Sequence, residues 1–491
     1  MLSVSEGAAE LFAAAVVSRE YLLHHRVCPD RLDGDGALVV ALGPGAFLEA
    51  IPELCDVYER KIVTRNVTDD ELERMIERIT AHVQDGADAT HLHEDDTADV
   101  REIANQPPVI RYVNTLLHDA YEAGASDIHI ESTRGGATAR VRVDGVLAPT
   151  NEPPRRLHAA VVSRLKLLAD LDISERRRPQ DGRIRVRVEN TELYLRVSTV
   201  PTVYGESVVL RLLDRGTRPV DLTALGMPDT ILREMAIAID RPHGMVLVTG
   251  PTGSGKTTTL YSALRRRDIR AEKVVTVEDP VEYQLEGVTQ VPVHRQAGVT
   301  FASALRSILR QDPDVVMIGE MRDTETAEIA IQASMTGHLV FSTLHTNDAI
   351  GALPRLFDLG IAPYLVAATL TAILAQRLVR IACPGCKSPE EPRDEVLVMQ
   401  HTVAPEVRGA NFVRANGCTA CRGTGFKGRI GIFELVSVGD ALRAAIARGA
   451  PRAELQALAD ARGYRPMVAD GIAKAATGIT TMDEVLRVCN A

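Results

Sequence analysis

A glycine-rich segment near the middle of the chain has the spacing of a phosphate-binding loop. The apolar run MVLVT leads into GPTGSGKT, and the run TTTLYSALRRR that begins at Thr257 favours a helix. This GxxxxGK[ST] pattern aims backbone N–H groups and a helix N-terminus at phosphate oxygens. The alternative, a chance glycine-rich turn, would lack the strand before it and the helix after it. We expect Lys256 to reach the β- and γ-phosphates of a nucleotide and the Thr257 hydroxyl to ligate Mg²⁺. The expected nucleotide contacts are Gly250, Pro251, Thr252, Gly253, Ser254, Gly255, Lys256, Thr257 and Thr258.

Two further apolar runs end in acidic residues. The run VVMIG leads to Glu320, the position of a Walker B acid, which would complete the Mg²⁺ shell through water. The run VVTV leads to Glu278, Asp279 and Glu282. Because ligands of open α/β sheets bind beyond the carboxyl ends of the strands, we expect these acids to face the γ-phosphate. One of them can then polarise the attacking water, although solvated acids at a strand end remain the plain alternative.

Two histidines flank another apolar run. His338 precedes LVFSTL and His345 follows it. A lone histidine near a strand is more often a structural residue with satisfied hydrogen bonds. Beside a nucleotide, either ring could sense the γ-phosphate or bridge to a neighbouring subunit, and the spacing alone does not decide between these roles.

Four of the seven cysteines form two CxxC pairs. Each pair can present two thiolates to one metal, and four thiolates give the closed tetrahedral site of structural zinc. The alternative is a redox dithiol, which either pair could form by itself. The expected zinc ligands are Cys383, Cys386, Cys418 and Cys421.

These residues must be positioned by several domains, because 491 residues exceed the size of one. Helix and buried-strand signals alternate from about residue 220 to 380, the α/β signature of a mostly parallel sheet. The polar, acidic stretch after residue 85 is typical of a linker. The expected divisions are an α/β module at 1–85, a linker at 86–105, a second α/β domain at 106–217, a nucleotide-binding domain at 218–382, a cysteine insert at 383–425 and a helical region at 426–491.

Composition excludes several classes of protein. The formal charge of −10, the 4% of aromatic residues and the absence of Trp argue against a translocase that tracks nucleic acid. The longest charge-free apolar stretch, residues 361–375, is too short to cross a bilayer. An N-terminus without a basic segment and an odd number of cysteines predict a cytosolic protein without a disulfide framework.

Taken together, the motifs resemble the secretion-ATPase superfamily of type II secretion and type IV pili. The resemblance is carried by GPTGSGKTTTLY, VEDPVEY, LRQDPDVVMIGEMRD and TGHLVFSTLHTND, and extends to GASDIHIE, RRRPQDGR, GCTACRGTGFKGRIGIFEL and DGIAKAATGITTMDEV. It covers residues from about 100 to 491. It implies a multidomain α/β chain with a RecA-like P-loop ATPase core, a preceding PAS-like domain, an N-terminal docking domain and a tetracysteine zinc insert.

The resemblance also assigns roles to individual residues. Glu282 corresponds to the catalytic base, supported by Glu278 and Asp279, and Glu320 to the Walker B acid. His338 and His345 form the family's His box. Arg183 and Arg196 match arginines that reach the nucleotide across a domain cleft or from a neighbour, and Arg306 and Arg310 match arginines near the phosphates or the subunit interface. The implied cofactors are ATP, Mg²⁺ and Zn²⁺.

The same resemblance implies a homo-hexameric motor on the cytoplasmic side of a bacterial inner membrane. Its expected partners are the secretion platform, namely the cytoplasmic domain of the L-type subunit and the polytopic F-type subunit, and no nucleic acid. The tetracysteine insert separates the chain from pilus-retraction motors, and one compact N-terminal domain favours the type II secretion branch over the alternative, type IV pilus assembly. The rival outside enzymes, a non-catalytic scaffold, is disfavoured by the intact Lys256, Thr257, Glu282 and Glu320.

Overall fold

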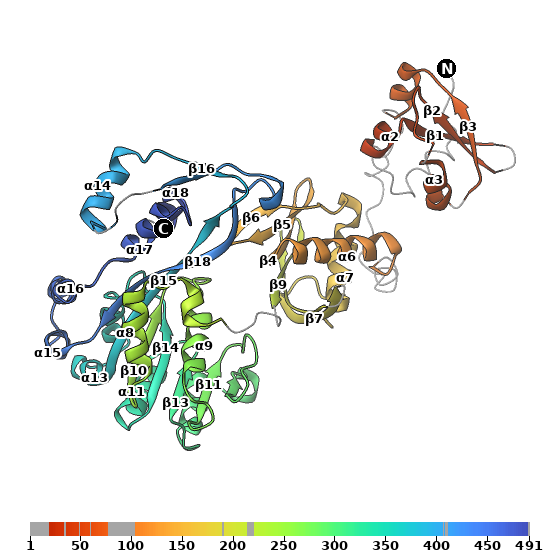
Figure 1. Cartoon of the computed structure of the whole chain (residues 1–491). Helices are drawn as coiled ribbons and strands as arrows, with labels where there is room; N and C mark the ends of the chain where they lie inside the picture. The colour runs from red at the N-terminus through yellow and green to blue at the C-terminus, as the bar shows by residue number, and fades with distance from the viewer. Residues whose placement is uncertain are drawn as a thin grey trace.

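The computed structural model describes residues 19–33, 36–48, 50–58, 60–76, 104–188, 191–213, 220–405, 407 and 411–489. Within these ranges it is a mixed α/β protein with four separate β-sheets (Figure 1). None of the helices in the described ranges combines the length and the apolar character needed to cross a membrane. The linker expected at 86–105 lies outside the described residues except for positions 104 and 105.

The N-terminal unit is a small three-stranded sheet with helices. Its elements are α2 (Arg19–His25), β1 (Val27–Leu32), β2 (Leu38–Leu42), α3 (Ala50–Tyr58) and β3 (Ile62–Asn66). Strand β2 lies in the middle, antiparallel to β1 and parallel to β3. All five residues of β2 are buried, which accounts for its continuous apolar run LVVAL. A further helix begins at residue 69 and continues to residue 76, where the described range ends.

The second domain packs two helices on one face of an antiparallel sheet. Its elements are α6 (Pro107–Glu122), β4 (Ala125–Thr133), β5 (Gly136–Val143), β6 (Val146–Pro149), α7 (His158–Leu168), β7 (Gln180–Val188), β8 (Thr191–Thr202) and β9 (Gly205–Leu213). The strand order is β6-β5-β4-β9-β8-β7. A hairpin turn at Asp144-Gly145 joins β5 to β6, and both residues take the positive φ that a tight turn requires. Alternate residues of each strand, such as Ile128, Leu195 and Leu210, are buried against α6 and α7, so the opposite face carries polar side chains.

The nucleotide-binding domain is built on a seven-stranded sheet of order β12-β11-β13-β14-β10-β15-β18. All neighbouring pairs are parallel except β15 and β18. Its strands are β10 (Gly244–Thr249), β11 (Val274–Glu278), β12 (Thr289–Pro292), β13 (Val315–Ile318), β14 (Leu339–Leu344), β15 (Leu370–Ala382) and β18 (Phe426–Ser437). Its helices are α8 (Asp229–Ile239), α9 (Lys256–Arg266), α10 (Phe301–Ile308), α11 (Thr324–Met335), α12 (Ala352–Asp358) and α13 (Pro363–Thr369).

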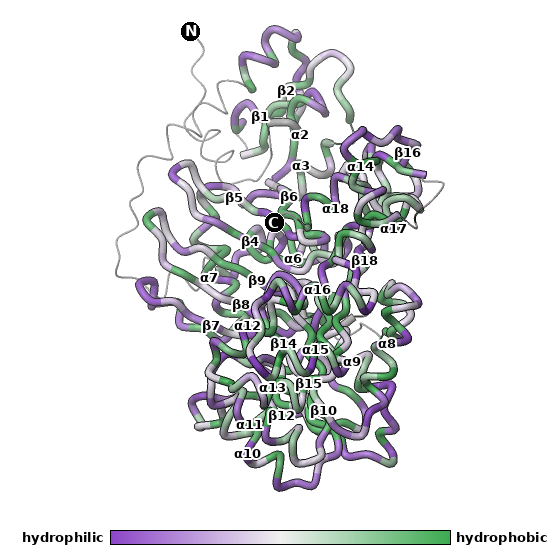
Figure 2. Tube along the Cα trace, turned by 90° about the vertical axis from the view of Figure 1, so that its left-hand side faces the viewer, coloured by the Kyte–Doolittle hydropathy of each residue, from purple (hydrophilic) through white to green (hydrophobic). Residues whose placement is uncertain are grey.

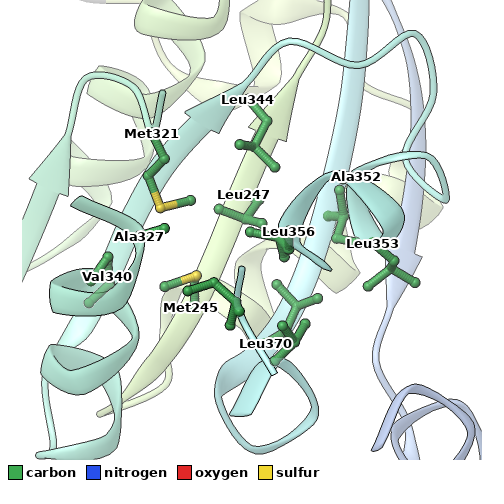
Figure 3. Close-up of a cluster of buried hydrophobic side chains, with 14 of the residues drawn as sticks. Met245, Leu247, Met321, Ala327, Val340, Leu344, Ala352, Leu353, Leu356 and Leu370 are labelled. Atoms are coloured by element: carbon green, nitrogen blue, oxygen red, sulfur yellow. The ribbon is translucent and has the colours of Figure 1, made fainter. Parts of the chain in front are cut away.

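Both faces of this sheet are covered by helices. Helices α8 and α9 bury one face, and α10 to α13 bury the other. Figure 3 shows the second of these cores, where Met245 and Leu247 of β10 face Leu353 and Leu356 of α12. In Figure 2 the tube is mainly hydrophobic along the strands of this sheet and hydrophilic at many of the loops that connect them. Burial on both faces explains why these strands are continuous apolar runs in the sequence.

The start of the C-terminal region differs from the expectation. Residues 426–437 are not helical but form β18, which pairs antiparallel with β15 and completes the central sheet. The run RIGIFELV has β-branched residues at alternate positions, a pattern typical of a strand. The helical pattern of the residues after it led to the wrong prediction of a helix here. Helices α15 (Asp440–Ala447), α16 (Arg452–Ala461), α17 (Met467–Ala476) and α18 (Met482–Cys489) follow, as expected.

The cysteine insert leaves the sheet after β15 and returns to it at β18. It contains β16 (Lys387–Pro389), α14 (Asp394–Val403), β17 (Val413–Ala415) and a 3₁₀ turn at Thr419–Cys421. Strands β16 and β17 form an antiparallel pair of their own. The insert is therefore an excursion between two neighbouring strands of the ATPase sheet.

Candidate nucleotide and metal sites

The phosphate loop leaves β10 and enters α9, as the sequence predicts. Its three glycines, Gly250, Gly253 and Gly255, have φ values of 147°, 78° and 86°, which residues with a side chain rarely adopt. A Cβ atom on Gly250 would lie 2.3 Å from the carbonyl oxygen of Gln376. The loop therefore depends on glycine both for its turn and for its close contact with β15.

Gln376 holds this loop from the side, a role that sequence reasoning missed. Its side chain is 2% exposed, and its amide donates to the carbonyl oxygen of Ser254 at 2.8 Å. Its own oxygen accepts the hydroxyl hydrogen of Thr259 on α9, at 2.5 Å. The available signal in the sequence was a glutamine directly after the apolar residues AILA. An amide side chain buried in such a run needs hydrogen-bond partners.

Lys256 begins α9 and folds back over the loop. Its Nζ atom donates to the carbonyl oxygens of Gly250 at 2.8 Å and Pro251 at 3.0 Å. Burial lowers the pKa of Lys256 to about 8, and the nearby charge of Glu320 opposes that change. A cation held this way can exchange two carbonyl partners for phosphate oxygens.

Glu320 and His345 meet beside this lysine, at the carboxyl ends of β13 and β14. The Nε2 atom of His345 lies 3.6 Å from Oε2 of Glu320, and Nε of Arg322 lies 2.7 Å from the same oxygen. Partial burial, together with the charge of Lys256, lowers the pKa of His345. The structure thus brings together Lys256, Glu320 and His345, three residues that are far apart in the sequence.

The expectation that Glu278 faces the phosphates is wrong. Glu278 is the last residue of β11, and its carboxylate is buried beneath α9 rather than exposed at the sheet edge. It accepts hydrogen bonds from the hydroxyls of Tyr261 and Thr276 and from the amide of Gln290. Alternation along β11 turns this side chain inward, so Glu278 ties the strand to α9 instead of binding nucleotide.

Glu282 lies four residues further on, in the loop after β11, and faces the second domain. Although the residue is exposed, desolvation by the protein around its carboxyl group raises that group's pKa, while Arg211 opposes the increase. Arg211 comes from β9 and also holds Asp127, with Nε at 2.8 Å from Oδ1. Sequence reasoning did not single out Arg211.

Arg211 is one of three arginines in a row across the second domain. Arg183 of β7 pairs with Arg196 of β8, and Arg196 pairs with Arg211 of β9. Strand alternation places them on the face opposite α6 and α7, because Ile184, Leu195 and Leu210 occupy the helix side. The strand register therefore aligns three arginines that are 13 and 15 residues apart in the sequence into one basic stripe.

Three other predicted residues, His338, Arg306 and Arg310, have partners outside the phosphate loop. His338 precedes β14, so the length of that strand, about 20 Å, separates it from His345 and the phosphate loop. Its Nδ1 atom is 2.9 Å from the carbonyl oxygen of Ala333 at the end of α11, so His338 is not part of this chain's nucleotide site. Arg306 forms an ion pair with Glu325, and Arg310 donates to the carbonyl oxygen of Arg306 at 2.9 Å.

The four insert cysteines converge, as predicted. Their sulfur atoms all lie within 4.8 Å of one another, and three of the pairs are 3.7, 3.8 and 3.9 Å apart. Tetrahedral Zn–S bonds of about 2.3 Å require sulfur separations of about 3.8 Å, so the cluster fits zinc. Burial raises the pKa of the Cys421 thiol, but hydrogen bonds from the amides of Cys418 and Gly425 and from the thiols of Cys418 and Cys386 together lower it to about 6.

Comparison with known proteins identifies the family. Residues 102–487 match the family described as type II/IV secretion system protein. Type II secretion system protein E of Klebsiella pneumoniae is 45% identical, covering 99% of this chain and 94% of the relative. The protein of that name from Xanthomonas campestris is 51% identical over 82% of this chain and 71% of its own length. The type IV pilus assembly ATPase PilB of Myxococcus xanthus is 43% identical, covering 96% and 85%.

Solved structures agree on the fold. The ATPase DotB of Legionella pneumophila superposes with a TM-score of 0.57 at 22% identity, covering 78% of this chain and 96% of DotB. The pilus retraction motor PilT superposes with a TM-score of 0.51 at 26% identity, covering 77% and 96%. This chain belongs to the type II/IV secretion system protein family, and it is an ATP hydrolase.

The lowered pKa of Lys256 predicts a pH-dependent affinity for ATP. Nucleotide phosphates favour the cationic lysine, so binding takes up a proton wherever the free lysine is neutral. Affinity should be full below pH 7 and fall by about tenfold per pH unit well above pH 8. Titration with a fluorescent ATP analogue from pH 6.5 to pH 9.5 measures this slope. The Lys256→Arg variant, whose guanidinium stays charged, is the control, and the same slope in that variant would assign the titration to another group.

The cysteine geometry predicts one zinc ion per chain. Elemental analysis of the purified protein should find it, and Cys→Ser substitution at any of the four insert positions should lose it together with much thermal stability, because binding energy at such a site is folding energy. The matched controls are Cys28→Ser, Cys55→Ser and Cys489→Ser, which lie outside the cluster and should keep the metal. A Cys383–Cys386 disulfide in protein kept reduced would contradict the prediction.

Proposed function

We propose that this chain is the motor ATPase of a type II secretion system, which hydrolyses ATP to drive assembly of a pseudopilus and export of proteins. One observation carries the proposal: the strand ends hold Lys256, Glu320 and His345 in one place, at the phosphate loop. Glu282, in the loop after the neighbouring strand β11, lies within the electrostatic influence of Arg211 of the second domain. The sequence relatives that carry the name type II secretion system protein E support the choice of system.

In this proposal each residue acts on a defined part of bound Mg²⁺-ATP. Loop N–H groups and Lys256 bind the β- and γ-phosphates, and the Thr257 hydroxyl and Glu320 hold the magnesium ion, Glu320 through water. Glu282 accepts a proton from the attacking water, a role for which a raised pKa is suited because it makes the carboxylate a stronger proton acceptor. Glu278 supports the site indirectly through α9.

The basic stripe of the second domain is the proposed source of charge neutralisation. Arg196 and Arg211 are 53% and 61% exposed, so neither guanidinium is committed to the interior. Closure of the second domain would bring them, with Arg183, to the γ-phosphate, where negative charge develops during hydrolysis. Release of phosphate would then let the domains separate, which converts hydrolysis into movement.

The remaining features complete the proposed motor. We propose a homo-hexamer with each site near a subunit boundary, zinc bound by the four cysteines, and a location at the cytoplasmic side of the inner membrane. There the N-terminal domain would dock to the cytoplasmic domain of the L-type subunit, and the ring would act on the polytopic F-type subunit. The six divisions of the chain given above remain predictions, with β18 counted in the ATPase sheet. Type IV pilus assembly is the second candidate, favoured by the likeness to PilB over 96% of the chain.

The two glutamates of the β11 loop predict opposite kinetic defects. Glu282→Gln should keep ATP affinity and lower kcat by about 10² or more, because it removes only the proton acceptor. Glu278→Gln should instead lower thermal stability, since it breaks a buried cluster with Tyr261 and Gln290, and should keep more of its turnover. Steady-state kinetics and thermal melts of both variants measure this contrast. Wild-type turnover in Glu282→Gln with loss of turnover in Glu278→Gln would reverse the assignment.

A cellular experiment tests the choice of secretion system. Lys256→Ala removes the cation at the β- and γ-phosphates, so hydrolysis should be lost while the fold is kept. Expressed in place of the natural chain, this variant should trap type II substrates in the periplasm and leave surface pili and twitching unchanged. Immunoblots of culture medium and periplasm measure type II secretion, and shearing of surface pili measures pilus assembly. Loss of pili with normal secretion would favour the pilus-assembly alternative.

A further inference from the structure

A carboxylate of the central sheet, Glu434, lies buried where the ATPase domain meets the C-terminal helices. Its residue is 3% exposed in the middle of β18. Oε1 accepts the backbone N–H of Ala349 at 2.6 Å, and Oε2 accepts the backbone N–H of Met467 at 2.7 Å. The side chain of Tyr464 forms a further hydrogen bond to it. The carboxylate thus joins two segments that are more than a hundred residues apart in the sequence.

The first of these segments, residues 345–351, also touches the nucleotide site. Thr346 donates its backbone N–H to the hydroxyl of Thr249 at 2.9 Å, and Thr249 is the last residue before the phosphate loop. His345, one residue earlier, contacts Glu320 at 3.6 Å. One end of the segment is therefore fixed by the phosphate loop and the magnesium-site acid, and the other by Glu434.

The second segment is the first turn of α17. Met467 is the N-terminal residue of that helix, so its N–H group has no partner within the helix. A negative charge is favourable at this position because of the helix dipole. The C-terminal region holds segment 345–351 at another point as well, since Nη2 of Arg452 on α16 lies 2.9 Å from Oδ2 of Asp348.

An ionised carboxylate suits this junction better than other polar groups. It is a pure acceptor with two oxygens, and it receives two N–H groups from opposite sides. Burial raises the pKa of Glu434, the neighbouring charge of Asp348 adds to this increase, and the two amides oppose it. A glutamine here would keep one acceptor oxygen and turn an NH₂ group toward an N–H donor, which leaves one buried amide without a partner.

We propose that Glu434 is a positioning residue that couples segment 345–351 of the nucleotide site to the N-terminus of α17. The position of His345 relative to Glu320 then depends on a residue of β18, and a nucleotide bound in the site stabilises the first turn of α17. Because such coupling is reciprocal, a load applied to α17 also changes the geometry at His345. The inference goes beyond the proposed secretion function and depends only on the binding and hydrolysis of ATP.

Kinetics of the purified full-length protein provide the first test. Glu434→Gln should lower kcat by about tenfold or more and leave the KM for ATP within about twofold, because the loop contacts of Lys256 and Gln376 do not involve Glu434. The matched control is Glu484→Gln, which removes another buried carboxylate of the C-terminal region. Glu484 binds Arg380 and Arg487 and not segment 345–351, so this variant should lose stability but keep kcat. Equal kcat values in Glu434→Gln and wild type, or a fall in kcat shared by Glu484→Gln, would overturn the proposal.

Hydrogen exchange of the wild-type protein gives a second test, which does not depend on the correct folding of a variant. A non-hydrolysable ATP analogue should slow amide exchange in peptides covering 345–351 and also in those covering 464–470. In Tyr464→Phe, which keeps the carboxylate and the ring, the second effect should persist. Protection confined to 345–351 in wild type would overturn the coupling. Absence of ATP hydrolysis by the wild type would instead refute the proposed motor, because exchange requires only nucleotide binding.

Discussion

The close contact between the phosphate loop and strand β15 is the constraint on which the rest of this structure depends. The loop can aim its N–H groups at phosphates only if its backbone turns through three residues of positive φ while lying against the backbone of Gln376. No side chain fits at Gly250, and the amide of Gln376 fixes both the loop and the first turns of α9. Strand β15 therefore acts as a template for the nucleotide site through Gln376.

Strand β15 is in turn ordered by what lies beyond it. Its outer neighbour, β18, runs antiparallel and arrives only after the cysteine insert has left and rejoined the sheet. The insert therefore closes a loop between two neighbouring strands, and a metal ion in it would reduce the entropy lost when these strands pair. On the same pair, Arg380 of β15 and Arg487 of α18 both hold the buried Glu484. Removing one partner of such an ionic cluster leaves a buried charge without compensation, which is unfavourable. These ion pairs therefore hold α18 firmly against the end of β15.

The sequence predicts what depends on local pattern and fails where a side chain's direction or a distant register matters. The phosphate loop, the β2 strand, the 144–145 hairpin and the cysteine cluster follow from spacing within short segments. Glu278 and His338 could not be placed this way. Glu278 belongs to an acidic run but points inward by strand alternation, and His338 belongs to a histidine pair but precedes the strand that His345 follows. Arg211 was not singled out because only the pairing of β7, β8 and β9 aligns it with Arg183 and Arg196. Gln376 acts through partners more than a hundred residues away in sequence, and Glu434 joins Ala349, 85 residues away, to Met467, 33 residues away.

Electrostatics explain why such a site should move when nucleotide binds. In this structure Lys256 and His345 lie beside Glu320, and the pKa of each is lowered by burial, in His345 also by the charge of Lys256. Arg322 already engages Glu320, and Arg211 of the basic stripe acts on Glu282. In the proposed motor, the triphosphate brings negative charge between these groups, so ATP would stabilise the arrangement that brings the stripe closest to the loop. Hydrolysis and release of phosphate would remove part of that charge and weaken this stabilisation. On this proposal, a cycle of closing and opening would need no element other than the charges at the strand ends and on the stripe.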